Sequence, residues 1–187
     1  MSDEHGHDHG DGEHGHHHHH GTDETLAFAV LTISSSRSSD EDESGPVASA
    51  AIEDAGHRVA VTDVVADDAA AIRERVETLA GERDGGVAEG DAVDVVVTTG
   101  GTGLTPDDVT IEAIRPLLDP EIPGIGEYFR RLSHEQVGTA AMLTRATAGI
   151  VGETAVYAFP GSPDAIALGV EDVLLPEIGH VVGLAGR

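Results

Sequence analysis

The order of apolar and polar residues predicts strands and helices that alternate along most of the chain. Some segments are continuously apolar, and others alternate with a period of two, as buried and half-buried strands do. They are 26–33, 58–65, 93–97, 147–151 and 154–159. Because helical patterns lie between most of these segments, the chain predicts an α/β fold, a mainly parallel sheet in three layers with helices on both faces.

Apolar residues recur at helical spacing in five segments between and after the strands. Gly56 and Gly81 end the first two helices, and the last helix begins after Pro160 and Gly161. The apolar positions are Val47, Ala50, Ala51 and Ala55; Ala69, Ile72, Val76 and Leu79; Ile111, Ile114 and Leu118; Ile125, Phe129 and Leu132; and Ile166, Val170, Val173 and Leu174.

Residues 1–25 follow neither period and form a segment of their own, rich in His, Asp and Gly. We predict a disordered tail here, in front of one domain that spans residues 26–187. Neutral imidazoles in this tail would bind a divalent metal loosely. The alternatives are an inert, solvated appendage and a purification tag.

Charge and composition narrow the function classes. The chain has 187 residues, with 35 acidic and 10 basic side chains and a formal net charge of -25. Without cysteine it forms neither disulfides nor thiolate zinc sites. The acidic excess argues against nucleic-acid binding, and no apolar run approaches the ~20 residues of a membrane helix.

Every basic residue is arginine, and the acids are spread through the whole chain. Salt at molar concentration screens the repulsion between such dense carboxylates. We therefore predict a cytoplasmic protein that works in high salt. The alternative is an acidic surface made for one partner.

The glycine loop after the third predicted strand is the most informative segment. Gly100, Gly101 and Gly103 allow positive φ and a close approach of backbone amides to a ligand. Thr99 and Thr102 add hydroxyl groups, and a predicted helix start follows at once, which favours anions. The loop therefore predicts a phosphate site, although it matches neither a P-loop nor the GxGxxG pattern.

Three acids follow predicted strands, as ligand-binding residues of α/β sheets do. Asp108 also fits a capping box with Thr105 at the N-cap; Asp67 fits the N-cap of the second helix, and Asp42 a solvated turn. Taken singly, each acid is explained by these local roles. Together with a phosphate loop they indicate Mg²⁺ and a phosphoryl or nucleotidyl transfer.

Several motifs resemble the MoaB/MogA family of molybdenum cofactor biosynthesis proteins, and their order and spacing are specific. The resemblance runs from about Leu26 to Leu184. The motifs are DESGP (42–46), TTGGTGLTPDDVT (98–110), GIGE (124–127), LTRATAGI (143–150) and FPGSPDAI (159–166).

The resemblance implies a molybdopterin adenylyltransferase that binds molybdopterin and Mg-ATP, transfers AMP and releases pyrophosphate. It also implies a small β-hairpin excursion from the sheet and a homotrimer or homohexamer. Asp67 and Asp108 match the family's essential aspartates, and Asp42 a further acid; we assign all three to Mg²⁺. The matching substrate-binding positions are Thr99, Gly100, Gly101, Thr102, Gly103, Glu127, Thr144, Arg145, Gly161 and Ser162.

Three alternatives share the fold. One is a molybdopterin-binding or carrier protein without catalysis. The pyrophosphatase-like domain of competence-damage proteins usually has GGLGPT where this chain has GGTGLT, and the molybdenum insertases need further domains. Two places depart from the family pattern: Asp164 stands where a basic residue is frequent, and Ser34 to Ser36 stand where the family often has Asn or Asp. Arg145 matches the family and is either an anion partner or part of a surface ion pair.

Overall fold

One five-stranded sheet organises the chain, in a computed structural model that describes residues 24–34, 43–81 and 93–187. The strand order is β2-β1-β3-β5-β4; β4 is antiparallel to β5, and the other neighbours are parallel. The strands are β1 (Ala27–Ile33), β2 (Arg58–Val65), β3 (Val95–Thr99), β4 (Thr147–Val151) and β5 (Thr154–Phe159).

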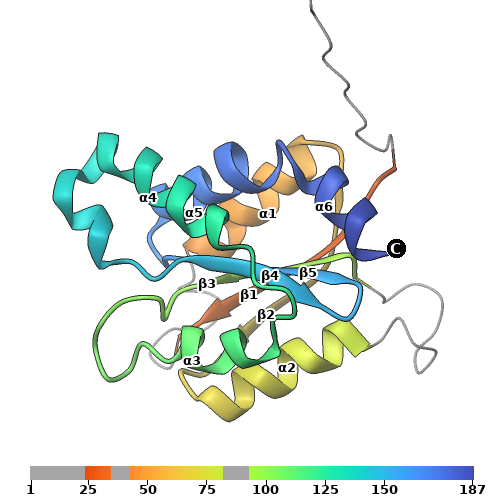
Figure 1. Cartoon of the computed structure of the whole chain (residues 1–187), viewed down its shortest axis with the longest axis horizontal. Helices are drawn as coiled ribbons and strands as arrows, with labels where there is room; N and C mark the ends of the chain where they lie inside the picture. The colour runs from red at the N-terminus through yellow and green to blue at the C-terminus, as the bar shows by residue number, and fades with distance from the viewer. Residues whose placement is uncertain (1–23, 35–42, 82–92) are drawn as a thin grey trace, which may run out of the picture.

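Helices cover both faces of the sheet, which confirms the predicted α/β fold class (Figure 1). They are α1 (Ser44–Asp54), α2 (Ala69–Gly81), α3 (Thr110–Ile114), η3 (Arg115–Leu117), α4 (Pro123–Val137), η4 (Gly138–Leu143), α5 (Pro163–Leu168), the π-helical η5 (Gly169–Leu174) and α6 (Ile178–Ala185).

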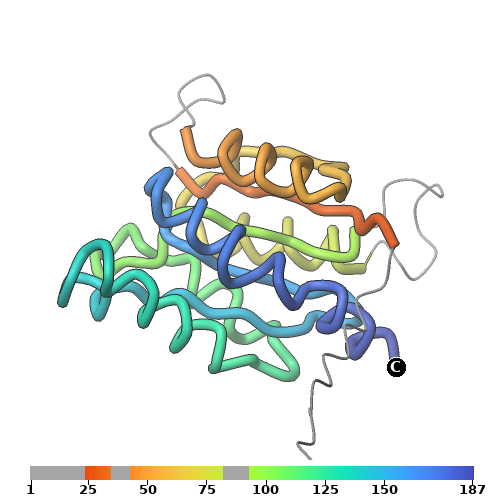
Figure 2. Tube along the Cα trace, turned by 90° about the horizontal axis from the view of Figure 1, so that it is seen from above, coloured from red at the N-terminus to blue at the C-terminus, as the bar shows by residue number. Residues whose placement is uncertain are grey.

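Two apolar clusters form the layers between sheet and helices. One includes Phe28, Phe129 and Tyr157 on the side of α1, α4, α5 and α6; the other includes Leu31, Ile72 and Ile114 on the side of α2 and α3. Figure 2 shows the trace from above, with α1 and α4 in front of the strands. The inner strands β1 and β3 are buried along their whole length, as expected for strands covered on both faces. No helix of the described residues has the length and apolarity to cross a membrane.

Three sequence predictions about elements were wrong in detail. The first helix buries Ser44, Gly45, Ala48 and Ile52. Of the predicted stripe, Val47 and Ala51 pack half-buried against the core, whereas Ala50 and Ala55 are exposed. Small side chains let this face approach its neighbours, so hydrophobicity alone selects the wrong positions. The third strand begins at Val95. The last predicted helix is α5 followed by η5, and a further helix, α6, was not predicted.

The predicted hairpin is formed by β4 and β5, which continue the main sheet. Because β4 runs antiparallel, it starts at the edge where the parallel strands end. This edge brings together Ser34 at the end of β1, the segments that follow β2, β3 and β5, and the segment that precedes β4. The predicted tail and the polar loop at 82–91 lie outside the described residues, apart from Glu24 and Thr25.

Candidate functional site

The glycine loop and the Pro160-Gly161-Ser162 turn lie against each other at this edge. The Gly100 amide donates to the Phe159 carbonyl at 3.0 Å. A Cβ atom on Gly161 would lie 3.0 Å from the Gly100 Cα, so the two loops meet backbone to backbone. Three of the predicted substrate-binding residues, Gly100, Gly161 and Ser162, are thus brought to one place from separate strands.

Positive φ confirms the conformational prediction at Gly100 and Gly101, with values of 105° and 64°, whereas Gly103 does not have positive φ. A Cβ on Gly100 would lie 2.6 Å from the Ile33 carbonyl oxygen, and one on Gly101 would overlap the Thr110 hydroxyl. Thr110, which the sequence analysis did not single out, holds the loop in place: its amide donates to Gly101 O at 3.1 Å and its hydroxyl to Gly100 O at 2.9 Å.

The capping box predicted at Thr105 is not present, because α3 begins at Thr110 with Val109 as its N-cap. Thr105 and Asp108 instead close a turn, in which the Asp108 amide donates to Thr105 O at 3.0 Å. The Thr105 amide and hydroxyl donate to Asp108 Oδ2 at 2.8 and 2.7 Å. Thr105 and Asp108 therefore pair their hydrogen-bonding groups in a turn instead of a helix. Because α3 begins only at Thr110, no helix N-terminus directly follows the glycines.

Hydrogen bonds keep the Asp108 carboxylate ionised. Burial alone would raise its pKa, but donors on the Thr105 side chain and on the Thr105 and Gly103 backbones, with the nearby Arg145 charge, lower the pKa below its usual value. The Gly103 amide thus donates to the Asp108 carboxylate. The amides of Gly101 and Thr102 make no hydrogen bond to another described residue.

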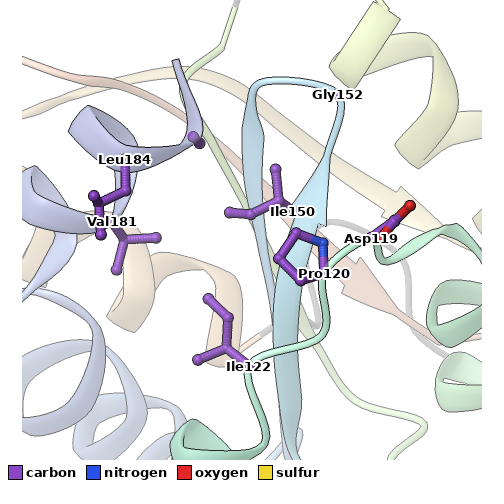
Figure 3. Close-up of a pocket in the computed structure, with 8 residues that line it drawn as sticks. Asp119, Pro120, Ile122, Ile150, Gly152, Val181 and Leu184 are labelled. Carbon is purple, nitrogen blue, oxygen red and sulfur yellow. The ribbon is translucent and has the colours of Figure 1, made fainter. Parts of the chain in front are cut away.

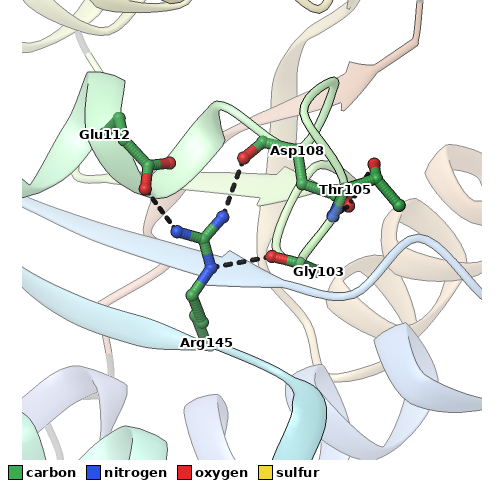
Figure 4. A network of polar contacts seen from close by, with 5 residues as sticks. All are labelled: Gly103, Thr105, Asp108, Glu112 and Arg145. Atoms are coloured by element: carbon green, nitrogen blue, oxygen red, sulfur yellow. Dashed lines mark hydrogen bonds and ion pairs between the residues drawn. The ribbon is translucent and has the colours of Figure 1, made fainter.

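Arg145 fastens the loop instead of standing free for an anion (Figure 4). Its Nε donates to Gly103 O at 2.7 Å and its Nη2 to Asp108 O at 2.7 Å, while Nη1 pairs with the Glu112 carboxylate. The Arg145 amide also donates to Thr102 O at 3.0 Å. Of the two roles that the sequence left open, the ion pair is present, but it belongs to a larger network.

Glu112 is a site residue that sequence reasoning missed. Its pKa is lowered first by the hydrogen bond from Arg145, against a smaller effect of burial. An acid in the first turn of a short helix gives no sequence signal for this partnership, because Arg145 is 33 residues away in the chain.

The predicted hydroxyl ligands have protein partners. Thr99 is fully buried and donates to Pro160 O at 3.1 Å. Thr102 is buried with its Oγ1 3.5 Å from that of Thr144. Ser162 is exposed at the N-cap of α5, where its Oγ accepts the Ala165 amide at 3.4 Å and keeps its own hydrogen for another acceptor. Asp164 is an acid of the first turn of α5.

Asp67 lies half-buried in the turn after β2, at the same edge of the sheet as the glycine loop. It does not cap α2 as one of its predicted roles required. Asp68 does so, because its Oδ1 accepts the amides of Ala70 and Ala71 at 3.0 and 2.9 Å. Since β1 separates β2 from β3, the two strand ends are about 10 Å apart.

The structure describes only two of the three acids predicted to bind Mg²⁺. Asp42 lies outside the described residues. Within the described ranges, no group of three or more His, Asp or Glu side chains is placed to hold a metal ion. Glu127 is exposed on α4 and lines a pocket together with Thr144 and Arg145.

Comparisons with known proteins agree with one another. Residues 29–180 match the family model of a probable molybdopterin binding domain. Molybdenum cofactor biosynthesis protein B of Bacillus subtilis is 44% identical over 142 residues, which are 75% of this chain and 79% of that protein.

Solved structures are similar over nearly the whole described domain. A crystal structure of Molybdenum cofactor biosynthesis protein B gives a TM-score of 0.78 at 40% identity and covers 88% of this chain and 98% of that one. The tungsten cofactor synthesizing protein MoaB from Pyrococcus furiosus gives 0.71 at 36% identity, covering 89% and 100%.

Proposed function

The chain belongs to the family of probable molybdopterin-binding domains, and we therefore propose that it transfers AMP from ATP to the terminal phosphate of molybdopterin. Its relatives are named for molybdenum cofactor biosynthesis, which gives the pathway. The proposed AMP transfer is supported by the geometry and charge of the site.

One observation carries this proposal: an ionised Asp108 stands beside a glycine loop that keeps two amides for a ligand. The loop is fixed by Gly100 packing on Gly161 and by Arg145 bonding to Gly103 O and Asp108 O. A preorganised set of donors is what a transferring phosphoryl group requires, because positioning and charge stabilisation dominate this chemistry.

In the proposed reaction, an oxygen of the pterin phosphate attacks the α-phosphorus of ATP. The bond from that phosphorus to the oxygen shared with the β-phosphorus breaks, and pyrophosphate leaves with its electron pair. The amides of Gly101 and Thr102 and the hydroxyl of Ser162 are suited to bind phosphate oxygens. With no lysine in the chain, such neutral donors take a large share of phosphate binding.

The residues fit a magnesium ion bound together with substrate. Mg²⁺ is commonly held by one or two carboxylates plus substrate phosphates, so a cluster of three acids is not required. Asp108 lies in the loop after β3, where hydrogen bonds favour its ionised form. Asp67 follows β2 at the same edge, and the end of β2 is about 10 Å from that of β3 because β1 lies between them. When bound, the ion would offset the negative charge of the phosphates.

The decisive experiment incubates the full chain with molybdopterin and Mg-ATP in molar KCl and follows adenylylated molybdopterin and pyrophosphate. Asp108→Asn should lower the transfer rate about 100-fold or more, since it removes the charge and keeps the shape. Asp107→Asn, an exposed neighbour, is the matched control and should retain the rate. Pterin binding by the wild type without AMP transfer would favour the carrier function.

Two further expectations belong to the same proposal. The dense acidic surface without lysine favours work in a high-salt cytoplasm, and the family resemblance favours a homotrimer or homohexamer. Sedimentation of the full chain at increasing KCl tests both: a trimer or hexamer that persists in molar KCl and dissociates at low salt is the expected result.

A further inference from the structure

The pocket that Glu127 lines with Thr144 and Arg145 is at the same edge, between η3, α4 and the segment before β4. Its volume is about 260 Å³. That is below the ~300–1,000 Å³ of pockets that enclose whole drug-sized ligands. It is therefore sized for one group of a larger ligand. Its charged lining residues are Arg115, Glu121, Glu127, Arg130 and Arg145.

Three of the ten arginines of the chain meet in this charged pocket, although the protein as a whole is strongly acidic. Two of them are occupied by protein acceptors. Arg115 bonds Glu121 Oε1 through Nε and Nη2, both at 3.1 Å, and Thr147 donates to the same oxygen at 2.9 Å. Arg145 is engaged by Glu112 and two carbonyls.

Arg130 is different, because its guanidinium makes no hydrogen bond or ion pair with any other described residue. It is nonetheless half-buried, on a part of α4 that packs tightly. A Cβ on Gly126, one turn earlier, would overlap Ala146 O and lie 3.2 Å from Arg130 Nη1. A cation held in a partly desolvated place without a partner favours an anion brought by a ligand.

We propose that the charged pocket binds one phosphate group of a substrate and that Arg130 is its cationic ligand. The inference rests on the proposed function, which supplies two phosphate-bearing substrates. Planar guanidinium groups suit phosphate through paired N–H donors. Thr144 adds a hydroxyl to the wall, and Arg145 forms a wall that the charged pocket shares with the glycine loop.

Glu127 provides a second test, in which a substitution should strengthen phosphate binding instead of weakening it. It lines the charged pocket, is exposed, and forms no ion pair with another described residue. A carboxylate at this place repels a bound phosphate. Glu127→Gln should therefore tighten phosphate binding, an effect that a damaged fold would not produce.

The experiment titrates the full chain with orthophosphate and with pyrophosphate in molar KCl, followed by ³¹P NMR or calorimetry. Arg130→Gln should weaken binding about tenfold, the loss expected for one charge-assisted contact. Arg130→Lys should recover part of it. Arg131→Gln is the matched control, because Arg131 is exposed and lies over the Tyr128 ring at 5.4 Å, away from the pocket lining.

The possible outcomes distinguish failure of this inference from failure of the proposed function. Equal affinities for the Arg130→Gln and Arg131→Gln variants, or no binding by the wild type, overturn the inference even if AMP transfer is observed. Binding that depends on Arg130 in a protein without AMP transfer keeps the inference and rejects the adenylyltransferase.

The two probes also identify the source of the phosphate. Preference for orthophosphate, with a raised KM for molybdopterin in Arg130→Gln, assigns the pocket to the pterin phosphate. Preference for pyrophosphate, with a raised KM for ATP, assigns it to the nucleotide.

Discussion

Two pockets of opposite chemistry lie on either side of the segment 119–123. The charged pocket takes Glu121 and Pro123 from this segment. The other, an apolar pocket of about 470 Å³, takes Asp119, Pro120 and Ile122 and is completed by Ile150, Val181 and Leu184 (Figure 3). One short stretch of chain thus forms the wall of both.

Side-chain alternation accounts for the difference. The segment runs antiparallel beside β4, with Glu121 bridged to Gly149 and extended there. The Asp119 amide donates to Ile150 O at 2.8 Å, the Ile150 amide to Pro120 O at 3.0 Å, and the Ile122 amide to Ala148 O at 2.7 Å. Successive side chains of an extended segment point to opposite sides. Glu121 therefore meets the arginines, whereas its neighbours Pro120 and Ile122 face the apolar side chains.

Substitutions on the two sides should therefore affect different measured quantities. The apolar side contributes through burial, so changes there should alter the free energy of unfolding. The charged side is built from groups that are partly solvated, where ion pairs add little stability. Changes on that side should alter binding and AMP transfer.

The largest effect is expected at the shared wall. A Cβ on Gly149 would lie 2.7 Å from Pro120 O and 2.9 Å from Leu118 Cβ, so Gly149→Val must push the segment 119–123 away from β4. We expect a loss of about 3 kcal/mol in the free energy of unfolding, and damage to both pockets. Denaturant unfolding followed by circular dichroism measures it.

Gly183→Ala is the control for that change, because a Cβ on Gly183 in α6 meets no heavy atom within 4 Å. This substitution should stabilise the protein by about 0.5–1 kcal/mol. A Gly149→Val variant as stable as the wild type would mean that the segment is not held against β4 as described.

The apolar side alone is tested by Ile150→Ala. Ile150 is 7% exposed. Its truncation should cost about 2 kcal/mol, the low end for such changes because the side chain already borders an open pocket. Phosphate binding and AMP transfer, measured where the variant is fully folded, should match the wild type. Weakened binding without unfolding would contradict the separation of the two sides.

On the charged side, Arg145→Lys tests the network around the glycine loop. Lysine keeps the charge but lacks the planar fork that reaches Gly103 O and Asp108 O together. We expect AMP transfer to fall about tenfold, equivalent to ~1.4 kcal/mol, with a smaller change in unfolding free energy. Arg131→Lys is the control, and faster hydrogen exchange of residues 103–108 should accompany the loss.

The smallest effect concerns the titration of Asp108. Its folded-state pKa is lowered below the unfolded value, so its contribution to stability is present above the unfolded pKa and is lost as pH falls through the folded pKa. Thr105→Val removes the hydroxyl donor and should raise the pKa of Asp108 toward its usual value. Carboxyl NMR titration measures this shift, and an unchanged pKa would remove Thr105 from the explanation.

Local patterns were enough to predict most elements and the glycine conformations. Buried runs and helical periods gave the strands and helices, and the need for positive φ was read from Gly100 and Gly101. The helix start at Thr105 was mistaken because the residues of a capping box also satisfy a turn. Local sequence does not decide between two structures that use the same hydrogen-bonding groups.

Long-range partners were the part that the sequence did not reveal. Arg145 reaches acceptors that are 33 to 42 residues away. Arg130 stands out only once Arg115 and Arg145 are seen beside it with their own acceptors. Charge that is already neutralised and charge that is still available look the same in a sequence.

The contact between Arg145 and Gly103 also has a consequence for the order of folding. It closes a stretch of 42 residues, and the entropy lost in closing a chain segment grows with its length. Pairing of β3 with β5, which joins residues as far apart as Val95 and Ala155, brings the two ends of this stretch near each other and makes the remaining closure short. We therefore expect the glycine loop to take its final form after these strands have paired. A spectroscopic probe on this loop should report a slower refolding phase than circular dichroism does, with the site completed last and released first.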